Sequence, residues 1–211
     1  MKELTLRKLA DWCGGTVAPE FESIVVSGVE SDSRKVEVGD LFVALRGERV
    51  DGFDFIPSAK TLGAAAALVS RKTEELPCIL VPDTLKAYGA IAKHYREETN
   101  VKVVGITGSV GKTTTKEMIA GVLSRDFKLY KSEGNHNNDI GLPMTIMDMP
   151  EGTELLVAEL GTNHPGEIAY LSEIAQPDYA VITNIGTTHI EYLGSREGIL
   201  HEKLDILRAS L

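Results

Sequence analysis

Glycines, a lysine and a run of hydroxyl side chains lie close together in GITGSVGKTTT (residues 105–115). An apolar run at 101–107 precedes this segment, and a helix is predicted after it at 112–124, which is the setting that phosphate binding needs. The glycines let backbone N–H groups converge on phosphate oxygens, and the lysine adds a positive charge. The sequence therefore predicts a nucleotide-phosphate site made of Thr107, Gly108, Ser109, Val110, Gly111, Lys112, Thr113 and Thr114.

The loop is a variant of the strict GxxxxGK[ST] pattern, because Ile106 stands where the first glycine is expected. A chance glycine turn is the alternative, and the strand, helix and GKTTT together argue against it. A GTPase would also need an NKxD motif after a later strand, and TNIG (183–186) does not supply one. A P-loop small-molecule kinase remains a competing interpretation.

Three further side chains have types that suit the same site. Glu159 ends an apolar run at 155–159, and a carboxylate at the carboxyl end of a parallel strand beside a phosphate loop suits Mg²⁺, as does the Thr113 hydroxyl. His189 follows the next predicted strand at 179–184, so we expect it at the same edge, near metal or phosphate. Lys203 lies in a helix predicted at 197–209. Without context, Glu159 would be a surface residue, His189 a structural hydrogen-bonding residue and Lys203 a solvated lysine.

The elements that must position these residues indicate an α/β fold. From residue 100 onward, apolar runs alternate with helical segments, which predicts a P-loop-type, mostly parallel sheet with about four strands. The earlier part predicts a small α/β domain, with a helix capped by Thr5 and strands at 23–29 and 40–45. We place the boundary where the pattern breaks, giving domains 1–99 and 100–211. The second domain ends on a helix without a closing strand and looks truncated.

Composition excludes several classes of protein. The chain has 211 residues, 43% of them hydrophobic, and a net charge of −9, which argues against disorder and against broad binding to nucleic acid or anionic membranes. No signal peptide or membrane-spanning run is present in this sequence. The two cysteines form no CxxC pair, so we expect a cytoplasmic protein.

Several blocks, taken in order, resemble the Mur ligase family of cell-wall biosynthesis, in particular its branch that adds D-alanyl-D-alanine. These blocks are SDSR (31–34) with GDLFVAL (39–45) and DG (51–52), GITGSVGKTTTKEM (105–118), GNHNNDIGLP (134–143), ELGTNHPGEI (159–168), and NIGTTHIE (184–191) with Gly194, Ser195 and Lys203. Val110 departs from the family, in which many members carry asparagine there. The chain is also shorter, because family members continue into a further Rossmann-like domain.

The resemblance implies a role for individual residues. Domain 1–99 would bind a UDP-sugar-peptide, with Ser33 and the loop Glu48-Arg49-Val50 at the uridine diphosphate; a polar turn and a charged surface loop are the alternative. The substrate-binding residues would further include Asn135, Asn137, Asn138 and Asn163, although asparagines in the 135–138 loop can equally be turn-formers. The implied catalytic residues are Lys112, His189 and Lys203, the last as a carbamylated lysine, and the implied Mg²⁺ ligands are Thr113, Glu159 and His189.

The implied reaction is ATP-dependent amide formation. The carboxylate of UDP-N-acetylmuramoyl-tripeptide attacks the γ-phosphate of ATP, and the amine of D-alanyl-D-alanine then displaces phosphate from the acyl phosphate. A monomer that binds neither nucleic acid nor membrane is expected, and activity of these residues alone is in question. A non-catalytic module that binds the UDP precursor is the third interpretation, beside the ligase and the kinase.

Overall fold

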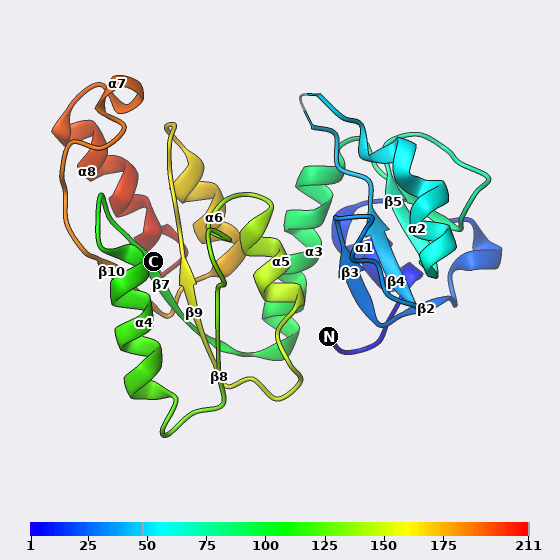
Figure 1. Ribbon diagram of the computed structural model, residues 1–211, viewed down its shortest axis with the longest axis horizontal. Coiled ribbons are helices and arrows are strands. Elements are labelled where there is room, and N and C mark those ends of the chain that lie inside the picture. Colours follow the sequence, from blue (N-terminus) through cyan, green and yellow to red (C-terminus); the bar gives the residue numbers. More distant parts are fainter. Residues whose placement is uncertain (48, 211) are drawn as a thin grey trace. The chain divides into compact units, whose positions relative to one another are not determined.

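The alternating apolar and helical segments fold into two parallel sheets, each in its own unit of the chain (Figure 1). The structure, a computed structural model, describes residues 1–47 and 49–210. Contacts divide it into one unit of residues 1–94 and a second that begins at residue 95. This division falls within helix α3 (Thr84–Thr99), and the boundary proposed from the sequence is the last residue of that helix.

The first unit holds a four-stranded parallel sheet in the order β3-β4-β5-β6 and a separate antiparallel pair, β1-β2, among its described residues. Helix α2 follows β4 and buries Ile56 and Ala59 against Phe42 and Val69 of the sheet. The elements are β1 (Leu4–Thr5), α1 (Leu6–Cys13), η1 (Pro19–Phe21), β2 (Val25–Val26), β3 (Gly28–Glu30), β4 (Asp40–Val43), η2 (Gly52–Phe55), α2 (Ile56–Leu62), β5 (Ala66–Val69) and β6 (Cys78–Leu80).

Two details of this unit compare directly with the sequence. The predicted N-cap is confirmed, because the Thr5 hydroxyl accepts a hydrogen bond from the Lys8 N–H at 3.3 Å. The single strand predicted at 23–29 is wrong. The chain instead forms two short strands on either side of Ser27, and β2 pairs with β1 while β3 joins the parallel sheet.

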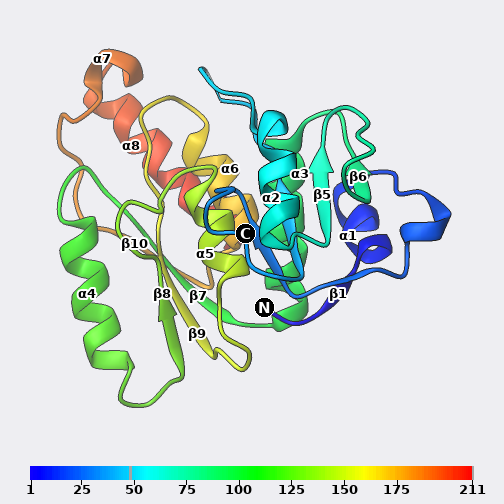
Figure 2. The same ribbon diagram turned by 45° about the vertical axis from the view of Figure 1, so that its right-hand side comes forward.

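The second unit confirms the predicted parallel sheet, with four described strands in the order β10-β7-β9-β8. Figures 1 and 2 show α4 on one side of this sheet and α5 and α6 on the other. Alternate residues of β7 and β9 form a core beneath α4. The elements are β7 (Lys102–Thr107), α4 (Lys112–Leu123), β8 (Leu129–Lys131), α5 (Gly141–Met147), β9 (Leu155–Glu159), α6 (Glu167–Ala175), β10 (Tyr179–Ile182), α7 (Ile190–Leu193), α8 (Arg196–Leu204) and η3 (Asp205–Ser210).

The helix predicted at 197–209 is wrong at its C-terminal end. The α-helix ends at Leu204 and the chain continues as a 3-10 helix. Ile199 and Ile206 are buried, whereas Leu200 and Leu207, which we expected to be available for the same buried face, are exposed. The change to three residues per turn alters which side chains face inward after Leu204, and so applies to Leu207. Leu200 lies within the α-helix, on a different face from Ile199.

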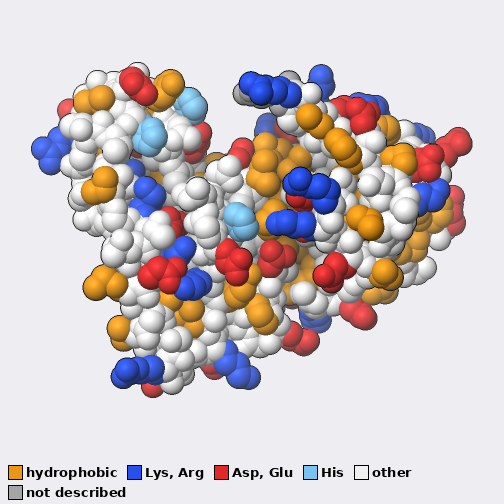
Figure 3. All heavy atoms as spheres, viewed as in Figure 1, with side chains coloured by type: hydrophobic (Ala, Val, Ile, Leu, Met, Phe, Trp, Pro, Cys, Tyr) orange, Lys and Arg blue, Asp and Glu red, His pale blue; other side chains and the backbone are white. Residues whose placement is uncertain are grey.

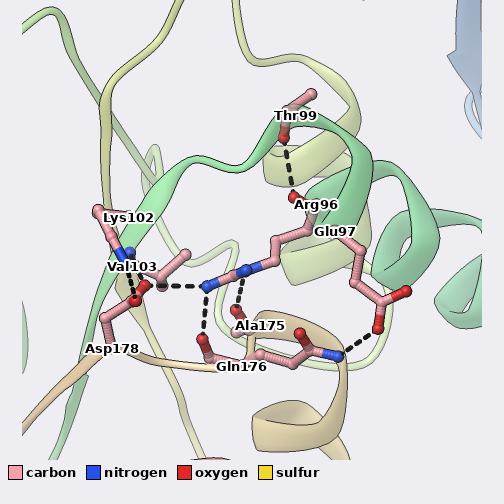
Figure 4. A network of polar contacts seen from close by, with 8 residues as sticks. All are labelled: Arg96, Glu97, Thr99, Lys102, Val103, Ala175, Gln176 and Asp178. Carbon is pink, nitrogen blue, oxygen red and sulfur yellow. Dashed lines mark hydrogen bonds and ion pairs between the residues drawn. The ribbon is translucent and has the colours of Figure 1, made fainter.

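A polar cluster ties the end of α3 to the start of β10 within the second unit (Figure 4). The Arg96 guanidinium donates to the carbonyl group of the last residue of α6 at 3.1 Å, to that of the following residue, Gln176, at 2.9 Å, and to the Asp178 carboxylate at 2.9 Å. Asp178 also accepts from the Lys102 ammonium at 2.7 Å and the Val103 N–H at 2.9 Å. A cation at a helix C-terminus satisfies carbonyls that have no partner in the helix.

The described residues add three observations. None of the described helices is long and apolar enough to cross a membrane. Acidic and basic side chains are intermixed over the face drawn in Figure 3. Both cysteines are free thiols in the described part of the chain.

Candidate nucleotide and metal site

The phosphate loop connects the end of β7 to the first residue of α4. Gly108 and Gly111 have φ angles of 148° and 85°, in the region that favours glycine. A Cβ atom on Gly108 would lie 1.9 Å from the Thr183 hydroxyl, so the loop also needs glycine there for close approach. The parallel register places the ends of β9, β7 and β10 at one sheet edge, pairing Ile106 with Glu159. The predicted convergence of strand ends beneath the loop is therefore observed.

The segment after β10 holds the loop from one side. Oδ1 of Asn184 accepts hydrogen bonds from the N–H groups of Ser109 and Val110, both at 3.1 Å. The Thr183 hydroxyl donates to the Val110 carbonyl at 2.6 Å, and the Gly186 N–H donates to the Ser109 hydroxyl at 2.9 Å. This role of Asn184 was not predicted from the sequence, because nothing in its spacing relates it to a loop 75 residues away.

Lys112, Thr113 and Glu159 lie together beside the loop. The Lys112 ammonium donates to the Gly108 carbonyl at 2.9 Å, and the Thr113 hydroxyl donates to Oε2 of Glu159 at 3.3 Å. Burial lowers the pKa of Lys112, and the negative charge of Glu159 opposes this shift. The loop, the first turn of α4, Asn135, Asn137 and Glu159 line a cavity of about 380 Å³. A hydroxyl and a carboxylate oxygen side by side are hard ligands, so these residues fit Mg²⁺.

Lys116 is a buried cation that was not predicted as a site residue from the sequence. Its side chain is 2% exposed, and its ammonium lies 3.2 Å from Oε1 of Glu159 and donates to the Ser132 carbonyl at 2.7 Å. Residues four apart share one face of a helix, so the spacing of Lys116 from Lys112 could have indicated that Lys116 lies near the site.

A second cavity, of about 540 Å³, adjoins the loop on the side of α6. Lys112 lines both cavities, and Asn137, Asn138, Asn163 and His189 also line the larger one. The structure therefore brings most of the predicted site residues together, although His189 and Glu159 line different cavities. The turn-forming role also applies to Asn138, because its Oδ1 accepts from the Gly141 N–H at 2.8 Å. The remaining loop residues differ in exposure: Thr107 and Ser109 are buried, and Val110 is 58% exposed.

The loop that carries Asn163 is held by a buried carboxylate that sequence reasoning also missed. Glu202, in α8, accepts from the N–H groups of Gly166 and Ile168 at 2.7 and 2.8 Å, and from the Thr162 hydroxyl at 3.2 Å. These N–H groups lie at the start of α6, where no carbonyl within the helix is available to them. Glu202 therefore fixes one wall of the larger cavity.

Lys203 is 3% exposed, so the alternative of a solvated helix lysine is wrong. Burial lowers its pKa to about 8; the positive charge of Lys112 adds to this shift and Glu202 opposes it. Lys203 lines neither of the two cavities, but it is close enough to Lys112 for the Lys112 charge to lower its pKa. At neutral pH the uncharged fraction of the Lys203 amine is therefore larger than that of an ordinary lysine.

In the first unit, Ser33 is 9% exposed and Arg49 lies on the surface. Glu48, the other charged residue of the predicted UDP loop, lies outside the described residues. Arg34 makes two hydrogen bonds to the Asp32 carboxylate, at 2.8 and 2.6 Å, and lowers the pKa of Asp32 to about 2. Arg34 is therefore paired within its own turn, with the carboxylate two residues before it.

Comparison with known proteins adds independent information on both units. The profile described as "Mur ligase family, catalytic domain" matches residues 25–125, and the profile described as "Mur ligase middle domain" matches residues 106–210. The UDP-N-acetylmuramoyl-tripeptide--D-alanyl-D-alanine ligase of Bacillus subtilis (strain 168) is 48% identical over 212 residues, covering 98% of this chain and 46% of that protein. The chain thus spans about half the length of the curated relatives it matches.

Two solved structures agree with this match over most of the chain. MurF from Acinetobacter baumannii has a TM-score of 0.93 at 38% identity, covering 99% of this chain and 47% of that one. The MurF ligase from Thermotoga maritima in complex with ADP has a TM-score of 0.81 at 39% identity, covering 87% of this chain and 43% of that one. On the agreement of motifs, fold and relatives across both units, the chain belongs to the Mur ligase family.

Proposed function

We propose that this chain forms the UDP-precursor-binding and ATP-binding parts of an ATP-dependent ligase that adds D-alanyl-D-alanine to UDP-N-acetylmuramoyl-tripeptide. The observation that carries the proposal is the Thr113–Glu159 pair beside Lys112, at the sheet edge where the phosphate loop curls. The Bacillus subtilis relative, named as this ligase, supports the choice of substrates. A cytoplasmic location and a monomeric state are part of the proposal.

The chemical problem is that a substrate carboxylate must approach the γ-phosphate of ATP although both are anions. Lys112 places a positive charge where the β- and γ-phosphates would lie, and the N–H groups at the start of α4 add partial positive charge. Mg²⁺, held by Thr113 and Glu159 with His189 near a second ion, would neutralise further phosphate charge. The larger cavity, of about 540 Å³, is the proposed place for the peptide end of the substrate and the incoming amine, because Lys112 lines it too.

Lys203 would act as a carbamate in this site. Its neutral amine attacks CO₂, the N–C bond forms as one C=O electron pair moves to oxygen, and the departing proton goes to water. The product carries a negative charge where an ammonium would face Lys112 in a confined space. Burial of Lys203 and the proximity of the Lys112 charge support this proposal.

Substituting Lys203 with alanine is expected to remove the ¹³C NMR carbamate signal that the wild-type chain gives in ¹³C-bicarbonate. In an enzyme extended to the length of its relatives, the variant should lose ligase activity and regain part of it with a short carboxylic acid. The matched control is Lys128→Ala, at an exposed lysine. A wild-type spectrum without the signal would contradict the carbamate.

The first unit should bind UDP-N-acetylmuramoyl-tripeptide, with UDP as a competitor. Ser33→Ala is expected to weaken this binding about tenfold, because a hydrogen bond to a charged group is lost. Ser58→Ala, at an exposed serine of α2, is the control. Titration calorimetry measures both, and absence of UDP competition would contradict the proposed role of Ser33, Arg49 and the rest of this unit.

Activity and binding measurements also separate the ligase from the two alternative functions, a small-molecule kinase and a non-catalytic binding module. A small-molecule kinase would turn over ATP with a hydroxyl acceptor and without dependence on D-alanyl-D-alanine. A non-catalytic module would bind the UDP precursor, and the Lys112→Ala substitution would leave its affinity for nucleotides unchanged. The polar residues Asn135, Asn137, Asn138 and Asn163 are proposed substrate contacts on the ligase interpretation, since they line the cavities around Lys112.

A further inference from the structure

We propose that Lys116 is a positioning residue that leaves Glu159 only one oxygen for metal binding, and that it thereby sets a preference of the site for Mg²⁺ over Ca²⁺. The inference rests on the proposed function, because it requires Glu159 to be a metal ligand. It concerns a residue outside the predicted nucleotide-contacting set.

Lys116 lies beside Glu159 and is shielded from solvent, so its charge acts on that carboxylate and not on dissolved ligands. It lies one turn after Lys112 on α4, and only 2% of its side chain is exposed. Its ammonium lies 3.2 Å from Oε1 of Glu159 and donates to the Ser132 carbonyl at 2.7 Å. A charged group this deeply buried is costly unless it is paired, so the pair holds both partners in place.

The two oxygens of Glu159 have different environments. Oε1 is buried and accepts no hydrogen bond from any described residue, so the nearby ammonium compensates its charge. Oε2 faces the Thr113 hydroxyl, beside the smaller cavity. The Glu159 N–H donates to the Ser132 hydroxyl at 3.2 Å, so Ser132 anchors the glutamate backbone as well as the lysine. The carboxylate therefore cannot rotate freely to offer both oxygens to one ion.

This arrangement distinguishes between the two common divalent cations. Ca²⁺ takes six to eight oxygen ligands and often binds carboxylates through both oxygens, whereas Mg²⁺ needs octahedral geometry, keeps several waters and uses one or two carboxylates. An ammonium on Oε1 removes the bidentate mode and part of the carboxylate charge. The remaining single oxygen, with the Thr113 hydroxyl, suits Mg²⁺ better than Ca²⁺.

The test measures the affinity of the 211-residue chain for ADP in the presence of Mg²⁺ or of Ca²⁺, by titration calorimetry. The variants are Lys116→Met and Lys116→Gln, of which glutamine keeps a donor for the Ser132 carbonyl. Glu117→Gln is the control, since Glu117 is the adjacent residue, half exposed, 3.6 Å from the same ammonium and paired with Lys131. Circular dichroism and urea unfolding establish that each variant is folded.

The expected result is a fall of about tenfold in the ratio of Mg²⁺-supported to Ca²⁺-supported ADP affinity in both Lys116 variants, the size typical of removing a partner of a metal ligand. The control should keep the wild-type ratio. An unchanged ratio in a folded Lys116 variant would overturn the inference, and so would failure of both variants to fold, which would make Lys116 purely structural. If neither metal ion changes the ADP affinity of the wild-type chain, the proposed function itself is overturned.

Discussion

Substituting Lys112 with alanine is expected to weaken Mg·ATP binding by about 30- to 700-fold, equivalent to about 2–4 kcal/mol. The ammonium is half-buried, donates to the Gly108 carbonyl and lies at the start of α4, where the terminal phosphates would sit. Its loss leaves phosphate charge uncompensated in a confined site. Titration calorimetry with a non-hydrolysable ATP analogue measures the effect.

The control for this substitution is Lys128→Ala, which removes the same charge from an exposed position before β8. It should bind the analogue as the wild type does. Equal affinities in wild type and Lys112→Ala would show that the nucleotide does not use the phosphate loop.

Substituting Asp178 with alanine is expected to lower the free energy of unfolding of the chain by about 2–4 kcal/mol. The carboxylate accepts hydrogen bonds from Arg96, Lys102 and the Val103 N–H, so its removal leaves three donors without this acceptor (Figure 4). Urea unfolding measures the change. Asp126→Asn, at an exposed carboxylate after α4, should change the free energy little.

The Asp178 contribution should also depend on pH in a defined direction. Burial raises its pKa, but the hydrogen bonds from Lys102 and Val103 and the charges of Arg96 and Lys102 lower it by more, so the net shift is downward. A carboxyl whose pKa is depressed by folding stabilises the fold above its unfolded pKa, about 3.9, and loses that contribution as pH falls through the folded value. The difference between wild type and Asp178→Ala should therefore shrink in acid. A difference that grows below pH 4 would contradict the assignment.

Local patterns were sufficient to predict most of the second unit. Strand β9 has the predicted bounds, α4 begins at the predicted residue, and the strands are parallel as predicted. The prediction succeeded because parallel strands that are buried on both faces have continuous apolar sequences. The errors arose where tertiary contacts override local pattern. The segment at 23–29 divides between two sheets, and the last turns of the 197–209 segment tighten into a 3-10 helix.

The candidate site divides in the same way. Lys112, Thr113 and Glu159 were predictable because their positions follow from one loop and one strand end. Asn184 and Glu202 were not, since each acts on backbone groups of a distant segment, and a side chain that holds a loop has no spacing pattern of its own. Burial of Lys203 likewise depends on packing that a helical pattern does not reveal.

The most direct measurement is a crystal structure of the chain with Mg²⁺ and a non-hydrolysable ATP analogue. We expect the β- and γ-phosphates to lie within the curl at 108–112, against Lys112, with a metal ion on the Thr113 hydroxyl and on Oε2 of Glu159. An analogue bound elsewhere with the curl empty, or a metal ion that Glu159 does not contact, would contradict it.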